Sequence, residues 1–385
     1  MHPKFGTGLA RNPGNTYSSK VRILQVITDT DRRGAQVFAV DLEAALLRLG
    51  HQVTTVALAV GAQSNGLPLE VLGPARRSPR ALSSLRKRMR GADITIAHGS
   101  STLMACALTG RPFVYRQISD TRFWAAGWPR RLRVAGFLRR AGHVVALSEG
   151  AASALNDHVW LPKSHITVVP NAVPRAGFAP ITESEREQAR EGLGIPRDAF
   201  VALYIGALVA EKGADLAVRA AAALPGAHLL VAGGGPQAAE LQALADQLSC
   251  RAHFVGVVQD TRPVYAAADV NVLPSRGGDS MPATLIESGM CGLPSVSTPV
   301  GSIEDVVVHD RTGFIVPIGD EAATTAALGM LHADEGLRRR MGAAATAYCT
   351  ERFDIDVVGA QWAAVLEQCV GRRVGRVRAL RRSRR

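Results

Sequence analysis

Two carboxylates in the stretch 274–294, Asp279 and Glu287, could accept hydrogen bonds from the hydroxyl groups of a sugar. The stretch reads as a strand end, a glycine-rich loop and a helix, with Ser280 as the expected N-cap and Pro282 in the first turn. Asp279 then lies in the loop, and Glu287 lies about a turn and a half into the helix. The two carboxylates would flank whatever the start of the helix binds.

The start of this helix is a predicted anion site. Free backbone N–H groups and the helix dipole favour a negative group at a helix N-terminus. A diphosphate bound there would bring a sugar and a ribose within reach of Asp279 and Glu287. The residues predicted to surround the diphosphate are Ser280, Met281, Pro282 and Ala283.

The stretch belongs to a chain of 385 residues, which exceeds the size at which one hydrophobic core stops growing. Apolar strands alternate with helical stretches along the chain, which predicts parallel sheets covered on both faces. We therefore expect an α/β fold of two Rossmann-like, doubly wound domains that face a cleft, with ligands outside the carboxyl ends of the strands. The expected strands are 21–28, 52–60, 93–97, 113–116 and 144–147, and then 200–205, 228–232, 253–257, 270–273 and 295–298.

Composition sets the expected domain boundaries. Residues 1–20 lack periodicity and should form a flexible leader before an N-terminal domain at 21–178. The alternation breaks at 168–174, which indicates a connection between domains. A C-terminal domain should follow at 179–370, and the arginine-rich residues 371–385 should form a disordered basic tail.

The stretch that begins at Pro274 resembles the E-x7-E region of the family 4 retaining glycosyltransferases of the GT-B fold. It reads PSRGGDSMPATLIESGMCGLPSV, and Asp279 stands where the first Glu of the family motif is usual. The resemblance implies transfer of a sugar from a nucleoside diphosphate sugar with retention of configuration. Asp279 would then orient the sugar hydroxyls, and Glu287 would hold the ribose.

A second match begins at Gly206, in the segment GALVAEKG, which resembles the family's G-R-L…K-G turn where Arg and Lys clamp the donor diphosphate. Lys212 is present, but Ala207 occupies the arginine position. The resemblance therefore implies a clamp that lacks one positive charge. Arg276 or Arg116 could supply it.

Two positions in the first half of the chain also match the family. Gly34, in the segment RGAQ, resembles the G-G-A-E/Q loop that approaches the donor phosphates, and His98 matches the H-x-H-G strand end. His98 is therefore a candidate catalytic residue in the cleft. The family's other cleft histidine would fall near Ile118, where Arg116 and Asp120 occupy the loop instead.

No metal or other cofactor is expected. The segment Asp29-Thr30-Asp31 spells the D-x-D of metal-dependent glycosyltransferases, but no neighbouring motif supports that interpretation. The five cysteines are scattered and never spaced as CxxC, so we expect buried thiols rather than metal ligands or disulfides. They are Cys106, Cys250, Cys291, Cys349 and Cys369.

Charge is distributed unevenly along the chain. Residues 1–178 hold 24 Lys and Arg against 9 Asp and Glu, residues 179–370 hold 13 against 24, and residues 371–385 hold eight Arg and no acid. The basic half suits an anionic membrane surface or a lipid-linked acceptor, although solvated helix faces over core aromatics would explain the same residues. No motif that reads nucleic acid accompanies the charge. The residues concerned are Arg76, Arg77, Arg80, Arg86, Lys87, Arg88 and Arg90, and then Phe123, Trp124, Trp128, Arg130, Arg131, Leu132, Arg133, Phe137, Leu138, Arg139 and Arg140.

These patterns predict a cytoplasmic glycosyltransferase, peripheral on the inner face of the plasma membrane, that takes part in glycolipid, polysaccharide or cell-envelope glycan synthesis. Its partners would be a nucleotide-sugar donor and a glycan or lipid-linked acceptor. No apolar run reaches the roughly 18 residues that a membrane-spanning helix needs. Two alternatives stay open: a nucleotide-sugar epimerase of the same fold, which needs no acceptor, and a nucleotide-binding, membrane-associated protein with weakened catalysis.

Overall fold

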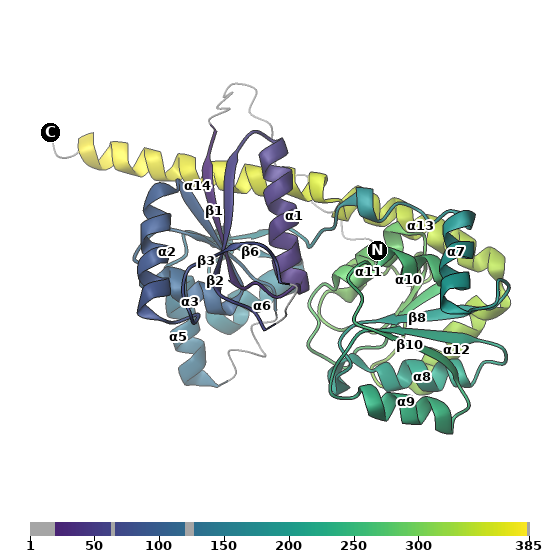
Figure 1. Cartoon of the computed structure of the whole chain (residues 1–385). Coiled ribbons are helices and arrows are strands. Elements are labelled where there is room, and N and C mark those ends of the chain that lie inside the picture. Colours follow the sequence, from purple (N-terminus) through teal and green to yellow (C-terminus); the bar gives the residue numbers. More distant parts are fainter. Residues whose placement is uncertain (1–19, 63–65, 120–126, 383–385) are drawn as a thin grey trace.

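The computed structural model describes residues 20–62, 66–119 and 127–382, with side chains as far as Arg372. The predicted leader therefore lies outside the described residues except for its last position, and so do Asp120, Phe123 and Trp124. The described residues form two α/β domains, each built on one parallel sheet (Figure 1). The predicted fold class is confirmed.

The sheet of the N-terminal domain has seven strands among the described residues, in the order β3-β2-β1-β4-β5-β6-β7. They are β1 (Arg22–Asp29), β2 (Gln52–Ala59), β3 (Glu70–Val71), β4 (Ile94–His98), β5 (Val114–Arg116), β6 (His143–Ala146) and β7 (Ile166–Val168). All of their pairs are parallel, so their carboxyl ends meet at one edge of the sheet.

Helices cover both faces of this sheet. They are α1 (Gly34–Arg48), α2 (Pro79–Gly91), α3 (Ser100–Leu108), α5 (Trp128–Leu138) and α6 (Glu149–Val159). Leu24 and Val26 of β1 pack with α2, α3, α5 and α6, whereas Ile23 packs with α1 on the other face. This alternation follows the period of two of an extended strand, and burial on both faces explains the nearly continuous apolar runs in the sequence.

The sheet of the C-terminal domain has six strands among the described residues, in the order β10-β9-β8-β11-β12-β13, again all parallel. They are β8 (Val201–Ile205), β9 (His228–Ala232), β10 (Arg251–Gly256), β11 (Val270–Leu273), β12 (Ser295–Ser297) and β13 (Gly313–Ile315). The helices are α7 (Glu183–Leu193), α8 (Ala214–Ala222), α9 (Ala238–Gln247), α10 (Arg262–Ala267), α11 (Ala283–Met290), α12 (Glu321–Ala333) and α13 (Glu335–Phe353). The sequence pattern does not predict β3, β7 or β13. Each is a strand of only two or three residues at a sheet edge, without the longer apolar run that marks a buried internal strand.

The last helix, α14 (Ile355–Arg382), corrects the predicted boundary of the C-terminal domain. Val358, Trp362 and Leu366 are buried in one core with α1 and the N-terminal sheet. Gly359 lies so close to α1 that a Cβ there would come within 2.8 Å of the Ala45 Cβ. The chain therefore crosses back to the N-terminal domain after α13, and Figure 1 shows α14 running across that domain.

The same helix corrects the predicted disordered tail. Where the sequence predicts disorder from Gly371, α14 continues as a helix to Arg382. Its apolar face holds the preceding turns against the N-terminal domain, with Cys369 and Val370 packed at the edge of the core. An anchored helix adds further turns at little cost, since nucleation is the unfavourable step.

None of the described helices is long and apolar enough to cross a membrane. All five cysteines carry free thiols; Cys106, Cys291 and Cys349 are buried, as expected. Cys250 and Cys369 are only half-buried, which corrects that prediction for two positions.

Candidate functional site

Two adjoining cavities lie between the domains, at the carboxyl ends of both sheets. The larger has a volume of about 580 Å³ and the smaller about 190 Å³. Residues from α1 line both cavities on one side, and the loop before α11 lines both on the other. Ten of the predicted site residues lie on these walls: Gly34, Arg116, Gly206, Lys212, Asp279, Ser280, Met281, Pro282, Ala283 and Glu287.

The start of α11 faces the smaller cavity. Its N-cap is Pro282 rather than the predicted Ser280, and no side chain caps the helix. The Ser280 carbonyl instead accepts a hydrogen bond from the Ser302 N–H at 2.6 Å. Gly301, with φ of 62°, lets the backbone approach, because a Cβ there would lie 2.2 Å from the Asp279 carbonyl oxygen. An uncapped helix start of this kind suits an anion.

Lys212 and Asp279 meet across the site as an ion pair. The Ser275 hydroxyl donates to the other carboxylate oxygen of Asp279, which holds that side chain in place. Lys212 ends a 3₁₀ turn, η3 (Ala210–Lys212), and Gly213 follows it with φ of 69°. A Cβ at Gly213 would lie 2.2 Å from the Pro274 carbonyl oxygen, so glycine brings Lys212 close to the end of β11. A lysine ammonium has three N–H donors, and further donors can reach a second anion.

Glu287 lies on the wall of the larger cavity, on α11. The Tyr265 hydroxyl donates to its Oε2 at 2.8 Å, and the Thr261 hydroxyl lies 3.4 Å from the same oxygen. Burial raises the pKa of Glu287 to about 7. A partly protonated carboxyl with one well-held oxygen can both donate to and accept from a ligand hydroxyl.

Asp41 of α1 lines the same cavity from the opposite domain, and burial raises its pKa to about 6. The negative charge of Asp41 also contributes to the raised pKa of Glu287. Sequence reasoning missed this residue. Its spacing was a usable signal, since Asp41 follows Gly34 by seven residues and so lies on the same face of a helix.

Arg116 ends β5 beneath the smaller cavity and is only 1% exposed. Its Nη2 donates to the Asn171 Oδ1 at 3.0 Å, and its guanidinium lies 3.6 Å from the centre of the Phe38 ring. Its Nε and Nη1 have no hydrogen-bond partner among the described residues. Burial lowers the pKa of Arg116 to about 9. Asn171, which the sequence did not single out, also donates to the Met281 carbonyl at 3.1 Å.

Two predicted site residues are not brought to the cavities. Arg276 pairs with Asp215 through two hydrogen bonds of 2.6 and 2.7 Å, and it lies on neither cavity wall. His98 is buried behind Phe38, and its Nε2 lies 2.9 Å from the Gln25 Oε1. Burial lowers the pKa of His98 well below its ordinary value, which keeps the ring neutral.

Asp29, the first residue of the D-x-D segment, is surrounded by cations instead of facing a metal site. Arg33 donates to both of its carboxylate oxygens at 2.7 Å, and Arg76 and Gln36 donate as well. The described residues contain no cluster of three or more His, Cys, Asp or Glu side chains that could hold a metal ion. The arrangement of Asp29 fits a structural ion-pair cluster.

Comparisons with known proteins agree with the architecture. Residues 32–176 match the family model described as Glycosyltransferase Family 4, and residues 199–334 match the model described as Glycosyl transferases group 1. A solved structure of Anabaena Alr3699/HepE in complex with UDP and glucose has a TM-score of 0.81 and 20% identity, and covers 90% of this chain and 100% of its own. At that identity the likeness shows the fold.

Two curated relatives share more sequence. A D-inositol 3-phosphate glycosyltransferase of Xylanimonas cellulosilytica is 36% identical over 223 residues, which is 55% of this chain and 53% of the relative. A GDP-mannose-dependent alpha-(1-6)-phosphatidylinositol monomannoside mannosyltransferase of Mycolicibacterium smegmatis is 28% identical over 319 residues, 77% of this chain and 82% of the relative. The chain thus spans about half the length of the first relative. The two family models, one for each domain, and the fold show that the chain is similar to family 4 glycosyltransferases of the GT-B fold.

Proposed function

We propose that the chain transfers a sugar from a nucleoside diphosphate sugar to an acceptor hydroxyl with retention of configuration and without a metal. One observation carries this proposal: Lys212, Asp279 and the uncapped start of α11 meet on one wall of the cavities between the domains. A cation and a helix start suit a diphosphate, and a neighbouring carboxylate suits sugar hydroxyls. The UDP and UDP-glucose named for the Anabaena structures support a donor of this class.

The proposed mechanism depends on position and charge. Lys212 and the amides at the start of α11 stabilise the negative charge that develops on the departing diphosphate. Asp279 orients the sugar hydroxyls, and Glu287 holds the ribose hydroxyls beside Tyr265. The departing phosphate accepts the proton of the acceptor hydroxyl on the same face of the sugar, so no protein nucleophile is needed.

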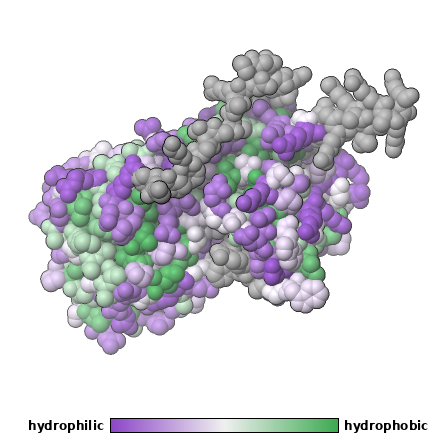
Figure 2. Space-filling model, turned by 180° about the vertical axis from the view of Figure 1, so that it is seen from behind, coloured by the Kyte–Doolittle hydropathy of each residue, from purple (hydrophilic) through white to green (hydrophobic). Residues whose placement is uncertain are grey.

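We propose an anionic or lipid-linked acceptor on a membrane surface. Trp128 and Leu132 of α5 are 70% and 48% exposed, and Arg130 and Arg133 are exposed beside them. Exposed Trp and Leu among arginines suit the interface of an anionic membrane. Figure 2 shows hydrophilic residues gathered over the N-terminal domain, on the right of that view.

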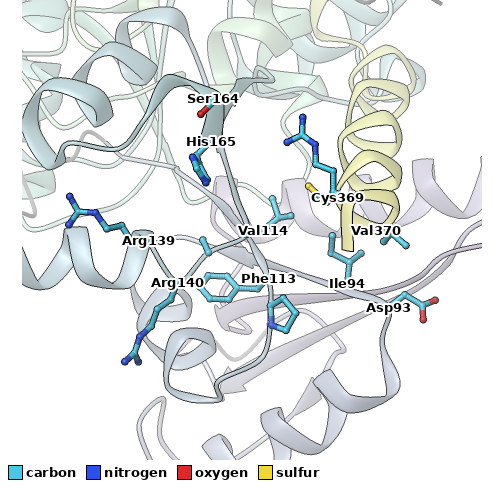
Figure 3. A pocket seen from close by; sticks show the side chains of 14 residues that line it. Asp93, Ile94, Phe113, Val114, Arg139, Arg140, Ser164, His165, Cys369 and Val370 are labelled. Atoms are coloured by element: carbon cyan, nitrogen blue, oxygen red, sulfur yellow. The ribbon is translucent and has the colours of Figure 1, made fainter. Parts of the chain in front are cut away.

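A cavity of about 840 Å³ at the opposite edge of the N-terminal sheet adds to this basic surface (Figure 3). Phe113 and Val114 line it, and the guanidinium groups of Arg139 and Arg140 point away from them, outward (Figure 3). Arg372 of α14 lies on the same wall. A cavity that has both apolar and basic side chains on its walls is a suitable place for an anionic lipid headgroup.

A thermal-shift screen of UDP, GDP and ADP tests the donor class, since a ligand that binds the folded chain raises its melting temperature. The diphosphate that stabilises the chain then identifies the nucleotide sugar for a transfer assay. Conversion of that donor into an epimer in the absence of an acceptor would favour the nucleotide-sugar epimerase. Binding of the donor without transfer or hydrolysis would favour a nucleotide-binding protein with weakened catalysis. Failure of all three nucleotides to bind would overturn the proposed function.

Co-flotation with vesicles tests the membrane surface. Trp128→Ser combined with Leu132→Ser should release the chain from vesicles that contain anionic lipid. Leu47→Ser combined with Leu49→Ser is the matched control, because these leucines of the α1 end are 49% and 48% exposed on the other face of the sheet. Equal loss of binding in both variants would contradict a specific role for α5.

A further inference from the structure

Arg116 is a buried cation that no anion among the described residues neutralises. Its one hydrogen bond in the structure goes to the neutral amide of Asn171, and two of its N–H-bearing nitrogens stay without a partner there. Burying an uncompensated charge is costly, so such groups are normally paired or bind a ligand. Tyr115, its neighbour on β5, is buried and remains a neutral phenol, because burial strongly raises the pKa of its hydroxyl.

The surroundings of Arg116 all favour a negative group. The smaller cavity is lined by the starts of two helices, α1 at Gly34 and α11 at Ala283, and neither start has a side-chain cap. Each uncapped start presents N–H groups and the positive end of a dipole. Among the described residues on this wall, Asp279 is the one carboxylate, and it already contacts Lys212 and Ser275.

Two other arginines near the cleft already form ion pairs with carboxylates of the same domain. Arg276 holds Asp215 with two hydrogen bonds, and Arg33 holds Asp29 with two more. Ala207 lines the larger cavity but brings no charge. Arg116, by contrast, lines the smaller cavity and has two nitrogens without a hydrogen-bond partner among the described residues.

We infer that Arg116 supplies the second cation of the diphosphate site, so that the diphosphate is held between Lys212 of one domain and Arg116 of the other. This inference rests on the proposed function. Asn171 is a positioning residue: it accepts from Arg116 and donates to the Met281 carbonyl, which ties the guanidinium to the loop before α11. Because the two cations belong to different domains, a bound diphosphate would join the two sides of the cleft.

Binding to four variants tests the assignment. The nucleoside diphosphate that stabilises the wild type, its nucleoside, and inorganic pyrophosphate are titrated by calorimetry. Arg116→Met should weaken diphosphate and pyrophosphate binding by about 10- to 100-fold and leave nucleoside binding unchanged, because each charge-assisted hydrogen bond contributes strongly. The diphosphate affinity of Arg116→Lys should lie between those of the wild type and Arg116→Met, because lysine keeps the charge but lacks the paired N–H donors of a guanidinium. Ala207→Arg in the Arg116→Met background should restore most of the affinity, and Arg276→Met should change nothing.

The rescue separates a ligand contact from a structural role. A charge placed at 207 on the opposite domain cannot repair a packing defect around Phe38, so lack of rescue in a folded double variant would overturn the inference. Unchanged affinity in Arg116→Met would overturn it as well. If Arg116→Met does not fold, the titration of Arg116→Lys tests the inference instead. Wild-type diphosphate affinity in Arg116→Lys would show that the diphosphate does not need two N–H donors of the guanidinium. Wild-type protein that binds no nucleoside diphosphate would instead reject the proposed function itself.

Small-angle scattering tests the link between the domains. The wild type should become more compact when the diphosphate is added, because the ligand joins Lys212 to Arg116. The Arg116→Met, Ala207→Arg variant should bind the same ligand without that change, since both cations then belong to the C-terminal domain. Equal compaction of the two proteins would show that Arg116 does not join the domains.

Discussion

The arginines on the two sides of the cleft have different partners. On the C-terminal side, Arg276 is partly exposed and holds Asp215 with two short hydrogen bonds. On the N-terminal side, Arg116 is buried, contacts a neutral amide and has donors left over among the described residues. Both arginines lie near the predicted diphosphate site in the sequence-based interpretation, yet the pairing of Arg276 is already satisfied. The difference teaches that a charge left without a partner inside a cavity is a better guide to a ligand than a charge that merely lies nearby.

Among the variants that test this comparison, replacement of Lys212 should have the largest effect on the rate of transfer. Lys212→Ala removes the cation of the C-terminal side, and transfer should fall by about 100- to 1,000-fold, as expected when one group that stabilises developing charge is deleted. The folded state should persist, because Lys212 is partly exposed. Arg219→Ala, which removes a half-exposed cation of the same domain, is the control for net charge. Transfer at the wild-type rate in Lys212→Ala, checked with a radiolabelled donor, would remove the basis for the proposed site.

The next largest effect concerns the turn that positions Lys212. Gly213→Ala places a Cβ against the Pro274 carbonyl, so the turn must shift and transfer should fall by about 100-fold. Gly226→Ala is the matched control, because Gly226 has φ of 77° with nothing within 4 Å. The control should lose only about 1 kcal/mol of unfolding free energy from backbone strain and keep its activity. Equal kinetics in the two variants would mean that the Gly213 turn does not position the cation.

A smaller effect is expected in the pH dependence of stability. The pKa of Glu287 is raised from 4.5 to about 7 by burial, so the folded chain binds this proton more tightly than the unfolded chain does. Its contribution to stability is therefore fully present below about pH 4.5 and is lost as the pH rises through about 7. Between pH 5 and 8 the wild type should lose about 2 to 3 kcal/mol more than Glu287→Gln, measured by denaturant unfolding.

Glu240→Gln on the exposed side of α9 serves as the control for this pH series. It should follow the wild-type curve. A Glu287→Gln variant with an unchanged pH profile would show that burial does not raise the pKa of Glu287. The two sides of the cleft, with Glu287 on one and Asp41 on the other, would then no longer share a carboxyl whose pKa is raised by burial.

Arg276→Gln should have the smallest effect. Its partly exposed ion pair with Asp215 contributes between about 0 and 1 kcal/mol to stability, and transfer should change less than about twofold. A steady-state assay and a thermal melt measure both quantities. A tenfold loss of transfer would place Arg276 in the donor site and would reverse the comparison between the two arginines.

Much of the fold follows from local patterns. The alternation of apolar strands and helices predicted two doubly wound sheets. The short strands β3, β7 and β13 were missed because they lie at sheet edges and lack the apolar run of an internal strand. The turn at Lys212 and the helix start near Pro282 were also predicted, since glycine, proline and cap preferences act within a few residues. The N-cap was predicted at Ser280, whereas it is Pro282, two residues later.

The sequence by itself determined which segments build the donor wall, because those residues are neighbours in the chain and their backbone preferences are local. Only the tertiary structure decided that α14 returns to the N-terminal domain and that Asp41 lines the same cavity as Glu287. It also decided that Arg276 has an anionic partner, whereas Arg116 has none among the described residues. These outcomes depend on contacts between residues far apart in the chain. Burial and long-range pairing set the free energy of each charge, and neither can be evaluated before the two domains are packed.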